Sequence, residues 1–265
     1  MNEQLHALVE RTLAKGVGAR VFPLRWDNRR IWVKQSVRAK HKVWHRVQRF
    51  AANITGIPLL RPTVSPGGQA GLESEAATLR KLAQVGVLVP DLIDVADHWI
   101  AIGDNGRILK NCIEDDVLKG DDNAVRAYVV DAGKALARLH GEGVAHGAPL
   151  LRNMTLRDDG QIGFIDFEED PNARMPIADA QARDVLLFVF SIQREFKKRP
   201  ELLRAGWQAY VQAAGETAPQ LVPLRKVVRL LRPIYLLLRP FRRWLGTDAL
   251  NGLWAYRTLR KSLYR

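Results

Sequence analysis

Alternating apolar and polar positions predict short strands in the first 112 residues. The segment 21–35 predicts two strands around a turn at Asp27 and Asn28, because this turn dipeptide separates two apolar runs. In the second of these strands, Ile31 and Val33 share one face and Lys34 lies on the other. Further strands are predicted at 90–95, 99–102 and 107–111. Together these segments predict a small antiparallel sheet.

Apolar residues at spacings of three and four predict the helices. An N-terminal helical segment precedes the first strand, and a one-sided helix is predicted over 73–82. A longer helix is predicted over 123–140, and the pattern beyond it is mainly helical. The segment 43–52 predicts a basic amphipathic helix, and the prolines and glycines of 56–71 predict an irregular loop. The chain is therefore expected to be an α+β protein.

The composition is that of an ordinary folded protein. Of the 265 residues, 47% are hydrophobic and 26% are charged, which excludes a disordered or collagen-like chain and favours one large domain or two small lobes. The one cysteine, Cys112, excludes an internal disulfide and a cysteine-based zinc cluster. Because this usage fits a reducing compartment, we expect a cytoplasmic protein.

Neither a secretion signal nor a membrane span is expected. The N-terminal residues alternate acids and bases instead of placing an apolar run after a basic segment. The longest apolar runs, at 185–190 and 234–238, are far shorter than the roughly 20 residues that cross a bilayer. We expect any membrane contact to be peripheral, on the inner face.

The formal charge of +13 is concentrated at the C-terminal end. Between Leu221 and Arg265 lie eleven lysines and arginines and one acid, Asp248. The bases alternate there with large apolar residues, as in helices that lie on an anionic membrane surface. The alternatives are a helical bundle packed on the body and, less favoured, a nucleic-acid surface. A second basic stretch, 29–49, contains no acid and also fits a phosphate-rich partner.

Candidate catalytic chemistry gathers in the segment 144–170. His146, Asn153 and Asp166 lie there on a predicted loop, strand, turn and strand. Mg²⁺ bound to nucleotide phosphates prefers oxygen ligands, commonly a carboxylate and an amide carbonyl at the ends of neighbouring strands. Asp166 and Asn153 provide these two ligand types.

This segment resembles the catalytic segment of the protein-kinase superfamily. His146 and Asn153 are seven residues apart, as in the superfamily's H-R-D-L-x-x-x-N loop, and Ile165-Asp166-Phe167-Glu168 resembles an I-D-F-E form of the D-F-G motif. The resemblance extends from Gly16 to Ile192. By its short N-terminal part and the segment EAATLRKLAQVGVLVP at 75–90, it is closest to bacterial lipopolysaccharide (Kdo/heptose) kinases and to Bud32/RIO-like atypical kinases.

The resemblance implies a two-lobed kinase-like fold. Residues 1–112 would form an N-lobe of strands and one helix, with a basic insert at 36–71. Residues 113–220 would form a mainly helical C-lobe that carries the motifs resembling the catalytic loop and D-F-G. Residues 221–265 would form a basic amphipathic helical tail.

The resemblance also implies ATP and Mg²⁺ as cofactors. Lys34 would contact the α and β phosphates, with Glu75 as its ion-pair partner and Glu73 as the competing candidate. Asn153 and Asp166 would hold Mg²⁺.

Two further residues are implied to be structural, and one position departs from the family pattern. His146 would pack in the loop, and Asp184 would brace the loop backbone. Ala148 stands where the family has the aspartate that accepts the acceptor's proton, and the nearest acids in sequence are those at 168–170. The glycine-rich loop is also incomplete, since Gly16-Val17-Gly18 has no third glycine.

These features predict an ATP- and Mg²⁺-binding kinase-like protein that phosphorylates an envelope sugar or lipid-linked acceptor at the inner membrane face. Its partners would be a nucleotide, a small-molecule or glycolipid acceptor, and an anionic membrane through residues 221–265. A pseudokinase scaffold, as Ala148 suggests, and an RNA-associated module of the Bud32/RIO type are the alternatives.

Overall fold

The N-terminal part of the chain folds around a four-stranded antiparallel sheet. The computed structural model describes residues 3–16, 19–36, 67–169, 171–197 and 199–264. The sheet has the strand order β1-β2-β4-β3, and α3 packs on β3 and β4. The elements of this part are α1 (Glu3–Ala14), β1 (Val21–Trp26), β2 (Arg29–Gln35), α3 (Gly68–Gln84), β3 (Leu92–Val95) and β4 (Trp99–Gly103).

The rest of the chain is mainly helical, with a second, three-stranded sheet of order β5-β6-β7 facing the first part. Its elements are β5 (Arg107–Ile108), α4 (Leu109–Lys119), α5 (Asp122–Gly141), η2 (Leu151–Asn153), β6 (Met154–Leu156), β7 (Ile162–Phe164), η3 (Pro171–Ala173), α6 (Ile177–Glu195), α7 (Pro200–Ala214), α8 (Leu221–Leu230), α9 (Arg232–Leu238) and α10 (Thr247–Leu263).

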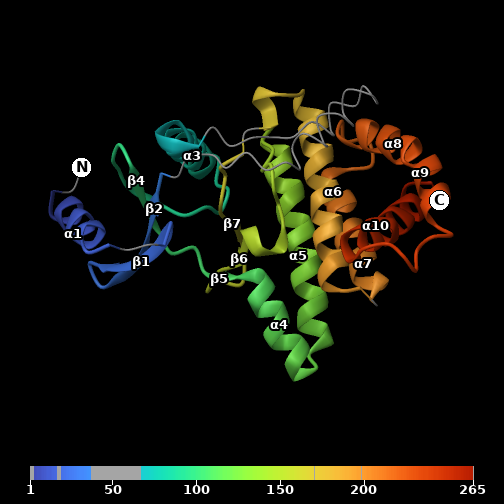
Figure 1. The fold of residues 1–265 in the computed structure, drawn as a ribbon, viewed down its shortest axis with the longest axis horizontal. Helices are drawn as coiled ribbons and strands as arrows, with labels where there is room; N and C mark the ends of the chain where they lie inside the picture. Colours follow the sequence, from blue (N-terminus) through green and yellow to red (C-terminus); the bar gives the residue numbers. More distant parts are fainter. Residues whose placement is uncertain (1–2, 17–18, 37–66, 170, 198, 265) are drawn as a thin grey trace.

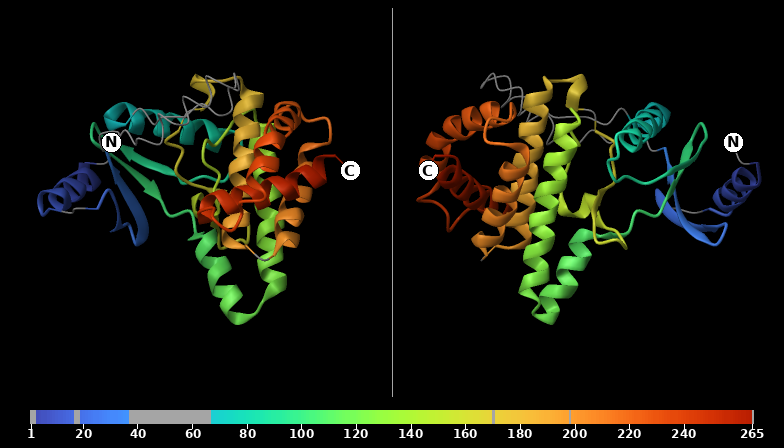
Figure 2. Two further views of the ribbon diagram at one scale, coloured as in Figure 1. Left: turned by 45° about the vertical axis from the view of Figure 1, so that its right-hand side comes forward. Right: turned by 180° about the vertical axis from the view of Figure 1, so that it is seen from behind.

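The two parts lie side by side, with the blue and cyan N-terminal elements on the left of Figure 1 and the yellow-to-red helices on the right. The views of Figure 2 show the same separation from two other directions. The predicted α+β class is confirmed, and the arrangement is consistent with a two-lobed kinase-like fold.

The hairpin of β1 and β2 forms as the sequence predicts. Trp26 pairs with Arg29, so Asp27 and Asn28 make a two-residue loop. These two residues have φ values of 49° and 55°. A tight hairpin turn of this kind requires positive φ at both central positions, and Asp and Asn tolerate it better than other non-glycine residues.

The two faces of β2 have different neighbours. Ile31 and Val33 are buried in a cluster with Leu5 and Val9 of α1. Because side chains alternate along a strand, Lys34 points to the opposite face, toward α3 and the cavity described below.

One predicted strand is partly wrong. The strand expected at 107–111 ends at Ile108, and α4 begins at Leu109. Leu109, Cys112 and Ile113 are buried, and their spacings of three and one fit the inner face of a helix. The short strand β5 also pairs with β6 in the second sheet instead of joining the four-stranded sheet.

Some predicted features lie outside the described residues. These are the helix expected at 43–52, most of the basic stretch 29–49 and of the insert 36–71, and Gly18. Of the loop expected at 56–71, residues 68–71 belong to the first turn of α3.

One hydrophobic cluster holds the helical part together. Buried residues of β6, β7, α4 to α8 and α10 contribute to it. Helices α5 and α7 cross within it, and a Cβ atom placed on Gly133 would lie 2.3 Å from the carbonyl oxygen of Gly206. The two glycines therefore let the helix backbones touch.

The C-terminal segment divides into packed and exposed helices. Leu224 and Val227 of α8 and Tyr256 and Leu259 of α10 are buried in the same cluster as the body. The helix between them, α9, has no buried residue. None of the helices in the described ranges is both long and apolar enough to cross a bilayer.

Replacing Gly133 by alanine should lower the free energy of unfolding by about 1–3 kcal/mol, because the added methyl group must push α5 away from α7. Denaturant unfolding followed by circular dichroism measures this. Gly252→Ala on α10 is the matched control, since its Cβ atom would meet nothing within 4 Å. This variant should not lose stability, because alanine favours a helix by about 1 kcal/mol over glycine. An equal loss of stability in both variants would contradict the role of the crossing.

Candidate functional site

A cavity of about 700 Å³ opens between the two parts of the molecule. Its lining comes from β1, β2, α3, β4, β5, α4, η2, β6 and the segment after β7. Apolar side chains such as Pro90, Ile102 and Ile108 share the lining with charged ones. A pocket with this volume and mixture is typical of small-molecule and cofactor sites.

Lys34 and Glu75 form a buried ion pair in this cavity. Nζ of Lys34 lies 2.7 Å from Oε2 and 2.9 Å from Oε1 of Glu75, and the two residues are 5% and 2% exposed. Glu75 points inward because it lies one helical turn before the buried Leu79. The competing candidate, Glu73, is exposed and accepts a hydrogen bond from Gln69 instead.

Lys34 is the centre of a wider charge cluster. Its Nζ also lies 2.9 Å from Oδ1 of Asp166, and it pairs with Glu168. Burial by itself lowers the pKa of Lys34, but the negative charges of Glu75, Asp166 and Glu168 outweigh burial and raise the pKa above its ordinary value. The ammonium group is therefore charged at neutral pH.

The carboxylates beside Lys34 respond in opposite directions. Burial raises the pKa of Glu75 by more than the attraction of Lys34 lowers it. Burial also acts to raise the pKa of Asp166, but the charge and hydrogen bond of Lys34 outweigh it and the pKa falls below its usual value. Asp166 is thus the carboxylate that stays ionised to lower pH.

The β6–β7 hairpin brings Asn153 and Asp166 together. Met154 pairs with Phe164, and the N–H of Ile165 donates to the carbonyl of Asn153 at 3.0 Å. Asn153 comes directly before β6 and Asp166 shortly after β7, so both fall at the same end of the hairpin. Both line the cavity.

The backbone of Asp166 has an uncommon conformation, with φ of 70°. Among the described non-glycine residues, the others with positive φ are Asp27 and Asn28, whose hairpin turn requires it. Such a conformation costs about 1–3 kcal/mol and persists only where neighbouring contacts hold it. Its ion pair with Lys34 is one such contact.

The side chains present fit a magnesium ion bound to phosphates. Nδ2 of Asn153 donates to the carbonyl of Ala148 at 3.0 Å, which orients the amide and leaves Oδ1 for a cation. The Asp166 side chain is 45% exposed. Mg²⁺ usually takes one or two protein carboxylates together with substrate phosphates. Within the described ranges there is no group of three or more His, Cys, Asp or Glu side chains arranged to hold a metal.

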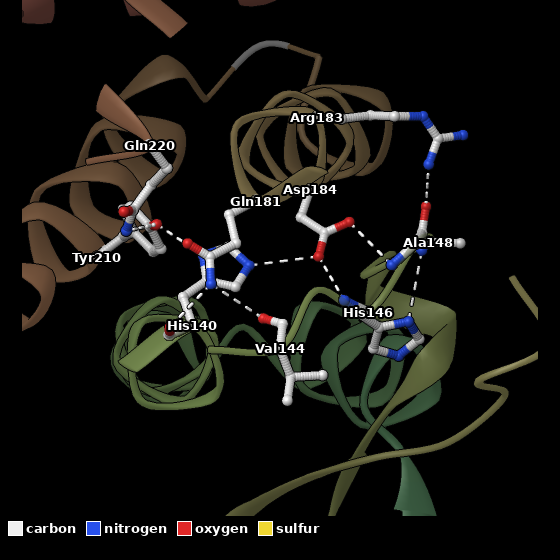
Figure 3. Close-up of polar contacts among 10 residues, drawn as sticks. His140, Val144, His146, Ala148, Gln181, Arg183, Asp184, Tyr210 and Gln220 are labelled. Carbon is white, nitrogen blue, oxygen red and sulfur yellow. Dashed lines mark hydrogen bonds and ion pairs between the residues drawn. The ribbon is translucent and has the colours of Figure 1, made fainter. Parts of the chain in front are cut away.

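Asp184 of α6 holds the backbone of the loop after α5 (Figure 3). Its Oδ2 accepts the N–H of His146 at 2.5 Å and its Oδ1 accepts the N–H of Gly147 at 2.9 Å. His140 of α5 lies 3.3 Å from Oδ2 through Nε2. Because the carboxylate is fully buried, these donors satisfy it in place of water.

His146 acts on the site through packing. Its ring is fully buried, stacks on Phe167 with 4.4 Å between centroids, and meets the edge of Phe164 at 5.6 Å. Burial lowers the pKa of His146, so the imidazole is neutral at neutral pH. The ring supports the segment that carries Asp166, which lies between these two phenylalanines in sequence.

Ala148 leaves the loop without an acidic side chain at the position of the family's aspartate. Of the acids nearby in sequence, Glu169 pairs with Arg183 at 3.3 Å, and Arg183 also donates to the carbonyl of Gly147 at 2.5 Å. Asp170 lies outside the described residues. Glu169 is therefore held beside the loop by a cation.

Glu168 and Arg20 are site residues whose contacts the sequence did not reveal. Glu168 pairs with Lys34 and, at 2.5 Å, with Nη2 of Arg20. The short separation of Glu168 from Asp166 is a signal that could have placed it in the cluster. Arg20 comes directly before β1, and no pattern in the sequence indicates its pairing.

Comparison with known proteins supports a kinase-like module. No protein-family model matches the chain. An uncharacterized protein of Haemophilus influenzae is 27% identical over 195 residues, which cover 74% of this chain and 72% of that protein. A probable bifunctional tRNA threonylcarbamoyladenosine biosynthesis protein of Methanoculleus marisnigri is 29% identical over 149 residues, which cover 54% of this chain and 25% of that protein. This second, distant similarity is to a Bud32-like, kinase-like protein.

Replacing Glu75 by glutamine should lower the free energy of unfolding by about 1–3 kcal/mol, because Lys34 stays buried and loses a charged partner. Glu73→Gln changes an exposed residue of the same helix and should alter stability by less than about 0.5 kcal/mol. Chemical denaturation of the parent and both variants measures the difference. If Glu75→Gln were as stable as the parent, the ion pair with Lys34 would not contribute to stability.

Proposed function

We propose that this protein is a kinase-like phosphotransferase that binds Mg²⁺·ATP in the 700 Å³ cavity. The observation that carries the proposal is that Lys34, Asn153 and Asp166, from three separate segments, line this one cavity. Phosphoryl transfer depends mainly on positioning and on stabilising charge, and a lysine, a carboxylate and an amide are the groups that do both.

Each side chain has its own task in this proposal. Lys34 donates to phosphate oxygens, while Glu75 fixes the direction of its ammonium group. Asp166 and Asn153 would hold Mg²⁺, Asp166 through its carboxylate and Asn153 through Oδ1. Bound Mg²⁺ would neutralise charge on the β and γ phosphates. Apolar lining residues such as Ile102 would contact the base.

The proposed acceptor is a hydroxyl group of an envelope sugar or lipid-linked molecule at the inner membrane face. Its support is the resemblance of the segment 75–90 and of the I-D-F-E motif to lipopolysaccharide kinases. Since Ala148 cannot accept a proton, turnover would rest on the metal and on positioning. General-base catalysis contributes about 10²–10⁴-fold, so a slow enzyme is expected.

Ala148 also supports a second candidate function, a pseudokinase that keeps the nucleotide cavity as a scaffold. The ion pairs of Glu168 with Arg20 and of Glu169 with Arg183 also support a scaffold, because neither acid is then free to replace the missing base. A third candidate, an RNA-associated module, is supported by the similarity to a tRNA threonylcarbamoyladenosine biosynthesis protein.

Saturating Mg²⁺·ATP should raise the melting temperature of the parent protein by about 5 °C or more, because a ligand at 100 times its Kd stabilises the native state by about 2.7 kcal/mol. Asp166→Asn should remove most of the shift, since it takes away the metal-binding carboxylate. Asp97→Asn, the same change in the exposed β3–β4 turn, should keep it. Differential scanning fluorimetry measures all three. No shift in the parent would refute nucleotide binding in the cavity.

Ala148→Asp should increase Mg²⁺-dependent ATP hydrolysis or transfer by about 10²-fold, the lower end of what a positioned base contributes. Ala148 is partly exposed, so the added carboxylate can be solvated. Adding Asp166→Asn to this variant should abolish the gain. This double variant tests whether the activity comes from this site. Nucleotide binding without any gain in turnover would favour the scaffold.

A further inference from the structure

The segment between Leu230 and Trp244 exposes large apolar side chains to an unusual degree. We call these residues the C-terminal patch. Leu237 is 67% exposed and Trp244 is 79% exposed, so most of each side chain contacts water. The patch consists of Leu230, Ile234, Leu236, Leu237, Phe241 and Trp244. Several large apolar side chains exposed within one short segment are typical of an interaction surface.

An arginine-lined pocket of about 220 Å³ lies beside the patch, between α9 and α10. Arg239, Arg242 and Arg257 line it, together with Tyr235 and Trp254. The guanidinium group of Arg257 lies 5.3 Å from the centre of the Trp254 ring. Three cations at one small pocket favour an anionic group such as a phosphate.

The patch and the pocket lie at one end of the molecule, beside helices that pack on the core. The flanking helices α8 and α10 bury Val227 and Leu259 in the core. In Figures 1 and 2, α9 lies at the end of the helical part that faces away from the four-stranded sheet. The surface is therefore separate from the proposed nucleotide cavity.

We infer that the C-terminal patch docks on the surface of an anionic phospholipid bilayer. In this arrangement Leu236, Leu237 and Phe241 enter the boundary between headgroups and acyl chains, where water no longer contacts them. Trp244 takes the interfacial position that its amphipathic ring favours. The arginines of the pocket bind lipid phosphates, and the neighbouring bases add attraction to the negative surface.

The combination of charges and apolar groups distinguishes a membrane from other occupants. Nucleic acid would satisfy the arginines through its phosphates, but it would leave Leu237 in water. A second copy of the patch would cover Leu237, but it would bring the arginines of both copies into one interface. An anionic bilayer satisfies both kinds of side chain at once.

Flotation of the 265-residue protein with phospholipid vesicles tests the inference. Vesicles of phosphatidylcholine with about 30% phosphatidylglycerol present the negative surface, and pure phosphatidylcholine vesicles do not. The parent should bind the anionic vesicles and should lose binding as salt is raised. Deleting residues 221–265 is not a suitable test, because α8 and α10 belong to the core.

Two variants remove the two halves of the surface. Leu237→Ser/Trp244→Ser and Arg239→Glu/Arg242→Glu should each weaken binding to anionic vesicles by about tenfold or more. Matched controls make the same kinds of change elsewhere: Val117→Ser/Leu118→Ser on exposed residues of α4 and Lys134→Glu/Arg138→Glu on α5. The controls should bind as the parent does. Because all of the changed residues are exposed, melting curves should confirm that the variants fold.

The outcomes separate this inference from the proposed function. Asp166→Asn should leave vesicle binding unchanged even if it abolishes nucleotide binding. Equal vesicle binding by the parent and both patch variants would overturn the inference, as would failure of the parent to bind anionic vesicles. Binding of single-stranded RNA in place of vesicles, or a dimer that Leu237→Ser/Trp244→Ser dissociates, would overturn it in favour of the other occupants.

Discussion

The buried ammonium group of Lys34 is the constraint on which the candidate site depends. A charge with so little contact with water is stable only where opposite charges and hydrogen bonds surround it. Glu75 comes to it from α3, and Asp166 and Glu168 come from the segment after β7. One cation of β2 thereby joins the sheet, the helix beside it and the second hairpin, and it fixes the walls of the cavity between them.

A second buried charge, Asp184, joins elements of the helical part, as Lys34 joins elements around the sheet. Its carboxylate ties α6 to the backbone of the loop that carries His146 and Gly147. The loop that would present a catalytic base is thus held in place, although Ala148 offers no carboxylate there. The proposed nucleotide site has its lysine, amide and carboxylate, whereas the loop lacks a side chain for proton transfer, and the proposed enzyme and the proposed scaffold differ in this respect.

Packing decides which basic and apolar residues of the C-terminal segment are exposed. The sequence shows bases alternating with apolar residues from Leu221 onward, a pattern that fits both a packed bundle and a surface helix. In the structure, α8 and α10 bury one side against the body, whereas α9 has no fully buried residue. The apolar residues are thereby divided between the core and the C-terminal patch, and the arginines beside α9 gather at one pocket.

Local chemistry let the sequence by itself determine the β1–β2 hairpin, the α+β class and the residues to examine. Asp27 and Asn28 tolerate the positive φ of the turn, and the spacing of His146, Asn153 and Asp166 singles out one short segment. Tertiary structure decided what depends on distant neighbours. The inward direction of Glu75 rather than Glu73 follows from how α3 packs, and the pairing of Arg20 with Glu168 joins residues far apart in the chain. A strand is expected at 107–111, but helix α4 begins at Leu109 because a helix buries Leu109, Cys112 and Ile113 together. Periodicity encodes which face of an element is apolar, but only the packed chain defines what that face meets.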